Sequence, residues 1–64
     1  MPSSVIRFYR YDAAKRELVV IFTSGLKYRY SDVPAEIHNG LEDAESKGEF
    51  FNRQIRDRYA FRRL

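Results

Sequence analysis

The spacing of apolar residues changes once along this chain of 64 residues, at Val33 and Pro34, and the change sets the order of its secondary structure. Before this point, β-branched and aromatic residues stand in short runs bounded by polar turns, which is typical of β-strands. After it, apolar residues recur every three or four positions, which is typical of amphipathic helices. The sequence therefore predicts strands first and helices afterwards.

The first half of the chain predicts an antiparallel meander of three strands. Residues 5–11 mix β-branched and aromatic residues with arginine, and residues 18–22 are apolar on both faces, as in a central strand. Ser24 and Gly25 mark a tight hairpin turn before the third strand, residues 26–30.

Two registers of this hairpin are open. If Thr23 pairs with Lys27 across a three-residue loop, Tyr28 lies beside Phe22 and Tyr30 beside Val20. With a two-residue loop, the two tyrosines would lie beside Ile21 and Val19. We favour the first register, because it groups the tyrosines with three apolar residues of the central strand, Leu18, Val20 and Phe22.

The second half predicts two helices. Pro34 suits the first turn of a helix, and one apolar stripe follows at spacings of four, four and three: Val33, Ile37, Leu41 and Ala44. Gly40 weakens this helix and marks a place where another group approaches its backbone closely. The segment from Ser46 to Glu49 matches a capping box. It starts a second helix whose buried stripe is Phe51, Ile55 and Tyr59.

A chain of this length makes one domain, residues 1–64. A three-stranded sheet needs a covering layer to be stable. The predicted fold is therefore α+β, in the order β-β-β-α-α, with both helices on one face of the sheet and the other face uncovered. There is no cysteine, which excludes disulfides and thiolate metal sites. No segment resembles a membrane span or a signal peptide, so we expect a cytoplasmic protein.

Charge is distributed in three blocks. Residues 1–30 carry six basic residues against two acids, residues 31–49 carry six acids against one lysine, and residues 50–64 carry five arginines against one aspartate. If the two ends meet in the fold, they form a basic surface that attracts polyanions. The alternative is that blocks of opposite sign pair with each other.

A set of residues along the whole chain forms one combined pattern: Ile6, Tyr11-Asp12, Leu18-x-Val20-x-Phe22, Gly25, Tyr28-x-Tyr30, Val33-Pro34, Leu41, Ala44-x-Ser46-x-Gly48, Phe51-Asn52-x-x-Ile55 and Tyr59. In this pattern the chain resembles the KTSC domain family, which is named after the C-terminal extension of some lysyl-tRNA synthetases and also occurs as small bacterial proteins. His38 stands where the family has an aromatic residue. The resemblance implies a connection with RNA, but no catalytic residue.

The uncovered face of the predicted sheet is the first candidate site. It presents Phe8, Arg10, Val19, Ile21, Lys27 and Arg29. An open sheet with aromatic and basic side chains binds single-stranded RNA by stacking bases and contacting phosphates. An apolar centre with a basic rim equally suits a protein interface.

The C-terminal arginines are the second candidate. Arg53 has acids four residues away on both sides, so intrahelical pairing explains it. Arg58 is expected to lay its stem along the edge of the core. Arg56 has no acid at helical spacing, and Arg62 and Arg63 are expected at or beyond the helix C-terminus. The number of arginines here exceeds what a helix dipole needs, which favours a phosphate-binding tail.

Residues with catalytic chemistry are scarce. His38 and Glu42 have helical spacing, but no third metal ligand is evident, and a surface charge pair is the better interpretation. Asn52 is interpreted as a structural polar anchor. The sequence therefore predicts a binding module that is not an enzyme and needs no cofactor, with RNA, such as tRNA, as the partner. The predicted RNA-binding residues are Arg7, Phe8, Arg10, Lys27, Arg29, Arg56, Arg62 and Arg63. The alternative is a protein partner or a homodimer through Phe8, Val19 and Ile21.

Overall fold

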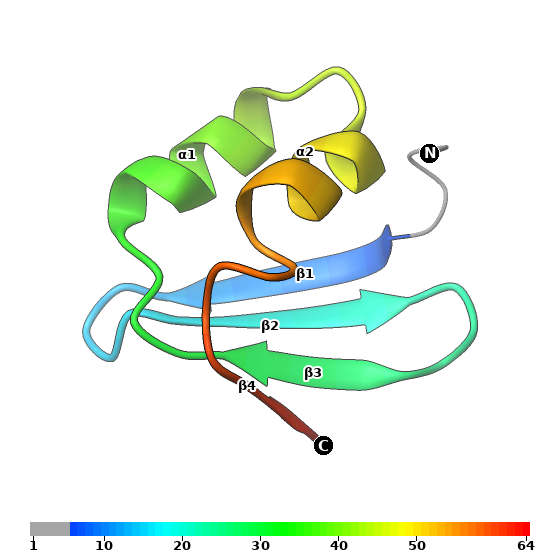
Figure 1. Ribbon diagram of the computed structural model, residues 1–64, viewed down its shortest axis with the longest axis horizontal. Coiled ribbons are helices and arrows are strands. Elements are labelled where there is room, and N and C mark those ends of the chain that lie inside the picture. Colours follow the sequence, from blue (N-terminus) through cyan, green and yellow to red (C-terminus); the bar gives the residue numbers. More distant parts are fainter. Residues whose placement is uncertain (1–5) are drawn as a thin grey trace.

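The computed structural model describes residues 6–64 as a four-stranded antiparallel sheet with two helices on one side of it (Figure 1). The elements are β1 (Ile6–Asp12), β2 (Glu17–Phe22), β3 (Lys27–Tyr30), α1 (Ala35–Asp43), α2 (Lys47–Gln54) and β4 (Phe61–Arg63). The predicted α+β class and the order of three strands before two helices are confirmed. No helix in residues 6–64 is long and apolar enough to cross a membrane.

The fourth strand was not expected. The second helix was predicted to continue through Tyr59, but α2 ends at Gln54, and the amides of Ile55 and Arg56 both donate to the Phe51 carbonyl. The chain then turns back to the sheet, where β4 pairs antiparallel with β3. Beyond the strand itself, Ser31 N donates to Ala60 O at 2.9 Å and Leu64 N donates to Lys27 O at 2.8 Å. These bonds occupy the outer edge of β3, which would otherwise be an unpaired strand edge.

The hairpin register differs from both predicted registers. Tyr28 pairs with Val20 and Tyr30 with Leu18. The loop has the expected three residues, but it consists of residues 23–25: Gly25 N donates to Phe22 O at 2.9 Å, and Gly25 has φ +93°. Because the loop starts one residue earlier than predicted, each partner moves by two positions, which leaves the faces unchanged. Both tyrosines therefore face the helices, as predicted.

The core lies between the sheet and the helices. Its buried residues come from both layers: Leu18, Val20, Tyr30, Val33, Leu41, Phe51 and Ile55. Of the predicted stripe of the first helix, Leu41 is buried and Ile37 packs at the edge of the core. Val33 is buried too, but it precedes α1, and Ala44 follows α1 as its C-cap, so α1 is shorter than the predicted stripe. In the second stripe, Tyr59 also packs against the core, but from the turn after α2. The expected cap is present, since the Ser46 side chain accepts from Glu49 N at 3.3 Å.

Gly40 is the point where α1 touches α2. A Cβ atom built at Gly40 would lie 2.7 Å from Cζ of Phe50 and 2.9 Å from its Cε2. Real carbon atoms do not approach this closely, so the Phe50 ring occupies the space that any side chain at position 40 would need. The predicted close contact is confirmed, and its partner is an aromatic ring.

Replacing Gly40 with alanine tests this contact. Elsewhere in a helix the change stabilises by up to ~1 kcal/mol. Here we expect Gly40→Ala to destabilise by about 1 kcal/mol, because the Phe50 ring must move away. In a Phe50→Ala background the same change should stabilise. Urea unfolding of the four proteins measures the coupling. Asn39→Ala, at an exposed neighbouring position, is the control for helix propensity alone. Stabilisation by Gly40→Ala in the otherwise native chain would contradict the packing.

Tyr30 is the one core residue with an ionisable side chain, and only 3% of its surface is exposed. The pKa of Tyr30 is raised from 10.0 to about 12, chiefly by burial and also by the nearby Tyr28 and Asp57, while Arg56 opposes the shift. The phenol therefore stays protonated at every physiological pH.

Stability should consequently fall at alkaline pH. Between pH 10 and 12 the unfolded chain loses the Tyr30 proton and the folded chain keeps it, so a rise in pH favours unfolding. We expect a Tyr30→Phe variant to lose less stability than the native protein over this range, as measured by urea midpoints at pH 8 and pH 11. Parallel declines in the two proteins would show that Tyr30 titrates normally in the fold.

Candidate nucleic-acid interface

The side of the sheet that faces away from the helices is built in rows across the strands. Pairing places Phe8 opposite Ile21 and Ile21 opposite Lys27, and the bond from Leu64 N to the Lys27 carbonyl adds Leu64 to this row. The next row holds four side chains, which are Arg10, Val19, Arg29 and Arg62. We call these two rows the open face.

Three arginines crowd the second row. Arg29 lies directly opposite Arg62, and Val19 lies between Arg29 and Arg10. Side chains directly opposite each other on antiparallel strands have Cβ atoms ~5 Å apart, and like charges at this distance are destabilising. Among residues 6–64 the ion pairs join His38 to Glu42 and Arg53 to Glu49, all on the helices. The arginine row is therefore a site of uncompensated positive charge.

The acids of this side of the sheet lie at one end. Asp12 pairs with Glu17 in the row beyond the arginines. The Asp12 carboxylate is engaged in the turn, where its Oδ1 accepts from Ala14 N at 3.1 Å and from Lys15 N at 3.2 Å. The open face thus has a basic centre with an acidic margin next to the β1–β2 turn.

The first row supplies apolar surface. Phe8 on β1 is 55% exposed and Leu64 beyond β4 is 51% exposed, and they stand at opposite ends of the row, with the half-buried Ile21 between them. An exposed phenylalanine ring beside arginines is the arrangement on which unpaired bases stack.

Five of the eight predicted RNA-binding residues share this face, namely Phe8, Arg10, Lys27, Arg29 and Arg62. Arg7 lies next to them, because the register shift between Ile6 and Phe8 makes it the extra residue of a β-bulge on the edge strand β1. The two basic blocks of the sequence therefore do meet. Pairing between blocks of opposite charge is limited, in the described part of the chain, to Arg53 with Glu49 at 3.4 Å.

The remaining predicted residues lie on the helix side. Arg63 pairs with Tyr28 and so points away from the open face. Arg56 follows α2, and its Nη1 donates to Asn52 Oδ1 at 3.2 Å, which makes Asn52 the polar anchor that was expected. Arg58 does not follow the core edge. It is exposed, and its Nε donates to the Arg53 carbonyl at 3.0 Å.

Sequence reasoning missed Leu64 and the placement of Arg62 opposite Arg29. The interpretation of residues 58–63 as a helix-end tail hid both. The apolar residues of this segment, Phe61 and Leu64, stand three positions apart, which is not the two-residue period of a strand. The sequence therefore does not distinguish this segment from an irregular tail.

His38 has a structural role. It stacks on Tyr11 with ring centroids 4.6 Å apart and an angle of 10°, and its Nε2 lies 3.5 Å from Glu42 Oε1. The histidine ring thus fills the place of an aromatic residue, and the expected contact with Glu42 is present, as an ion pair when His38 is protonated. Tyr11 in turn donates to the Val33 carbonyl at 2.6 Å, which ties β1 to the start of α1. Among residues 6–64 no group of three or more potential metal ligands occurs.

Comparison with known proteins agrees with the resemblance. The KTSC domain family matches residues 2–59. A crystal structure of a KTSC domain protein from Yersinia pestis superposes on the whole chain and on 90% of its own length, with a TM-score of 0.93 and 33% identity. A protein of Tsukamurella paurometabola is 40% identical over 57 residues, which cover 89% of this chain and 85% of that protein.

A lysine–tRNA ligase of Nostoc punctiforme is also similar. It is 36% identical over 61 residues, which cover 95% of this chain and 11% of the ligase. The family match ends at Tyr59, before β4 and the two arginines that this strand adds. From the family match, the fold and these relatives together, the chain belongs to the KTSC domain family.

Proposed function

We propose that this protein is a non-catalytic RNA-binding module that uses the open face, and that it acts in the cytoplasm. The observation that carries the proposal is the row of Arg10, Arg29 and Arg62, three arginines across the sheet without an acidic partner among the described residues. The three positive charges repel one another in the free protein, and phosphates that bind between them remove this repulsion. The removal of the repulsion adds to the binding free energy of an anionic RNA backbone.

The arrangement suits RNA better than a single small anion. The open face has positive charge in one row and the exposed Phe8 ring in the next row. Within a row, side chains on neighbouring strands are ~5 Å apart, and the two rows are ~7 Å apart along each strand. An unpaired base can stack on Phe8 while its flanking phosphates contact Arg10 and Lys27. A guanidinium group can also form bidentate hydrogen bonds with a phosphate, which a lysine ammonium group cannot.

The relatives support the same partner class. Sequences similar to this chain make up 11% of the length of two lysine–tRNA ligases, and the name of these enzymes refers to a tRNA. A segment that binds RNA without sequence preference would add affinity to such an enzyme through tethering alone. We therefore take tRNA and single-stranded RNA as the ligands to test.

Removing single arginines provides the test. We expect fluorescence anisotropy to show binding of labelled tRNA or single-stranded RNA at ~50 mM salt, with log affinity falling by ~0.7 to 0.9 per phosphate contact for each log unit of salt. Arg29→Gln and Arg62→Gln should each weaken binding. Each should also make the plot of log affinity against log salt less steep by ~0.7 to 0.9, the contribution of about one phosphate contact.

The matched control is Arg53→Gln on α2. It removes the same charge, but Arg53 lies on the opposite side of the sheet and already pairs with Glu49. It should leave affinity and salt slope nearly unchanged. No binding at low salt, or equal losses from Arg53→Gln and Arg29→Gln, would show that the open face is not an RNA site.

Self-association is the alternative that the apolar row favours. Phe8, Ile21 and Leu64 form exposed or half-exposed apolar surface with Val19 beside them. In a two-fold dimer, however, the same face meets itself, so each arginine row approaches the row of the other copy. This repulsion disfavours a dimer at low salt.

Sedimentation velocity separates the two functions. We expect a monomer at low and at high salt. A dimer that strengthens as salt screens the arginines, and that Ile21→Lys abolishes, would favour self-association through Phe8, Val19 and Ile21. The control variant is Lys15→Glu, because Lys15 is exposed in the β1–β2 turn and lies outside the apolar row. Ile37→Lys would not serve as a control, since Ile37 packs against the core.

A further inference from the structure

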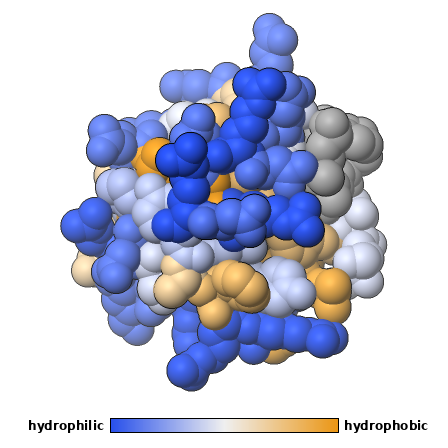
Figure 2. Space-filling view, viewed as in Figure 1, coloured by the Kyte–Doolittle hydropathy of each residue, from blue (hydrophilic) through white to orange (hydrophobic). Residues whose placement is uncertain are grey.

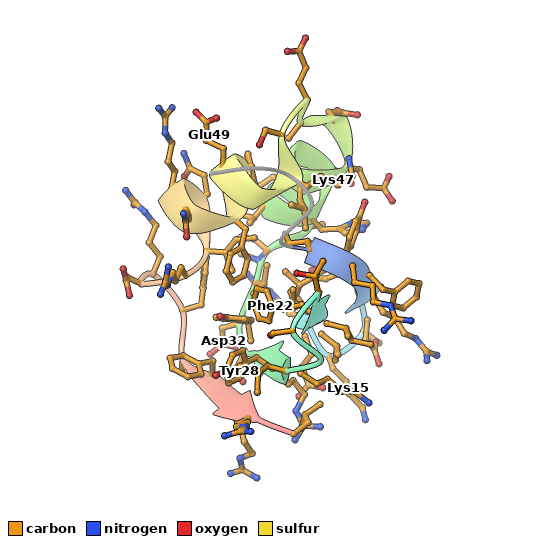
Figure 3. All side chains as sticks on the ribbon, turned by 90° about the vertical axis from the view of Figure 1, so that its right-hand side faces the viewer. Lys15, Phe22, Tyr28, Asp32, Lys47 and Glu49 are labelled. Carbon is orange, nitrogen blue, oxygen red and sulfur yellow. The ribbon has the colours of Figure 1, made fainter. Side chains whose placement is uncertain are left out.

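A second concave surface lies on the other side of β3 and β4, where α2 stands over the strands. It encloses about 490 Å³, within the ~300–1,000 Å³ typical of small-molecule sites. We call it the groove, and the residues that matter here are Phe22, Tyr28, Phe61, Asn52, Arg56 and Asp57. Figure 3 shows Phe22 between α2 and the strands, with Tyr28 nearer to β4.

The groove has an aromatic wall. Tyr28 stands edge-on to Phe22 at 5.7 Å and edge-on to Phe61 at 5.5 Å, measured between ring centroids. Phe61 is 58% exposed, the highest value among the large apolar residues that the structure exposes. Figure 2 shows apolar surface on this side of the molecule between hydrophilic side chains above and below it. A planar ring from a ligand can cover Phe61 and remove this apolar surface from water.

The polar end of the groove offers donors and acceptors together. Arg56 Nη1 donates to Asn52 Oδ1 at 3.2 Å, which positions the guanidinium at the groove, and the Asp57 carboxylate follows it in the chain. A cation next to an anion does not favour a bare phosphate. It matches the edge of a nucleobase, which presents donors and acceptors side by side.

The groove and the open face lie on the two sides of the edge strand β4. Within β4, Arg62 points to the open face and Arg63 to the groove side, because neighbouring residues of a strand point to opposite faces. Both arginines are exposed. An RNA strand that crosses this edge would meet Arg62, then Arg63, and then the groove, with phosphates along the path and a base at its end.

We propose that the groove binds one unpaired nucleobase of the RNA held on the open face. Phe61 stacks on the base, Arg56 and Asp57 contact its edge, and Arg63 contacts the phosphate that precedes it. This inference rests on the proposed function, and it adds a second contact region on the far side of β4 with a different ligand chemistry. The open face binds backbone and stacks one base, whereas the groove recognises a base edge.

Free nucleotides test the groove apart from the RNA. We expect the four nucleoside 5′-monophosphates to shift the ¹H–¹⁵N resonances of Thr23, Ser24 and Phe61 and of residues 52–57, with differences among the four bases. Ribose 5-phosphate, which lacks the base, should leave these resonances in place. Equal shifts from ribose 5-phosphate, or nucleotide shifts confined to the open face, would overturn base recognition in the groove.

Variants extend the test to RNA. Phe61→Ala should abolish the nucleotide shifts and weaken binding of a single-stranded oligonucleotide about tenfold, the effect of losing one stacked base. Phe8→Ala separates the two surfaces, because it removes a similarly exposed ring from the open face: it should weaken binding of the oligonucleotide but leave the nucleotide shifts in the groove intact. Arg56→Gln is a second variant, which removes the cation at the polar end of the groove and leaves the aromatic wall unchanged. Circular dichroism shows whether each variant is folded.

The two proposals fail in different ways. Salt-dependent RNA binding that responds to Arg29→Gln but not to Phe61→Ala, without nucleotide shifts in the groove, would overturn this inference and leave the proposed function in place. Nucleotide shifts in the groove without any RNA binding at low salt would overturn the proposed function, together with the claim that the base belongs to a bound RNA strand.

Discussion

The structure depends on the packing of two helices against one face of the sheet. The helices have nine and eight residues, and among residues 6–64 the buried core lies between them and the strands. A small domain buries only a modest share of its surface. In the described part of the chain no helix covers the other face of the sheet, and this is the face on which the basic side chains meet.

The fourth strand changes what that uncovered face is. Without β4, the sheet would end at β3 with a row of unpaired backbone groups and one arginine at its margin. With β4, Arg29 becomes an interior position of the sheet and stands opposite Arg62. Two like charges held across a strand pair oppose folding, and an anion removes that opposition. Pairing of the β3 edge and the added positive charge beside Arg29 thus come from the same three residues, Phe61–Arg63.

The helix side carries the opposite balance. The acidic block of the sequence forms α1 and the start of α2, and the aromatic side chains of β3 and β4 form the wall beneath them. Asn52 in α2 and Arg56 just beyond it, joined by a hydrogen bond, give this wall a polar end.

Local pattern was sufficient for the class of fold, for the order of three strands before two helices, and for the face of each residue in these three strands. Alternation, the hairpin glycine, the capping box and the apolar stripes act within a few residues, so they can be seen in the chain. They also placed Phe8, Arg10, Lys27 and Arg29 together. The exact partner of Tyr28, the end of α2 at Gln54 and the pairing of Arg62 with Arg29 depend on contacts between segments distant in sequence. The backbone groups at the edge of β3 form hydrogen bonds with a segment that is distant in sequence. No local pattern in residues 61–63 shows that they provide these hydrogen bonds.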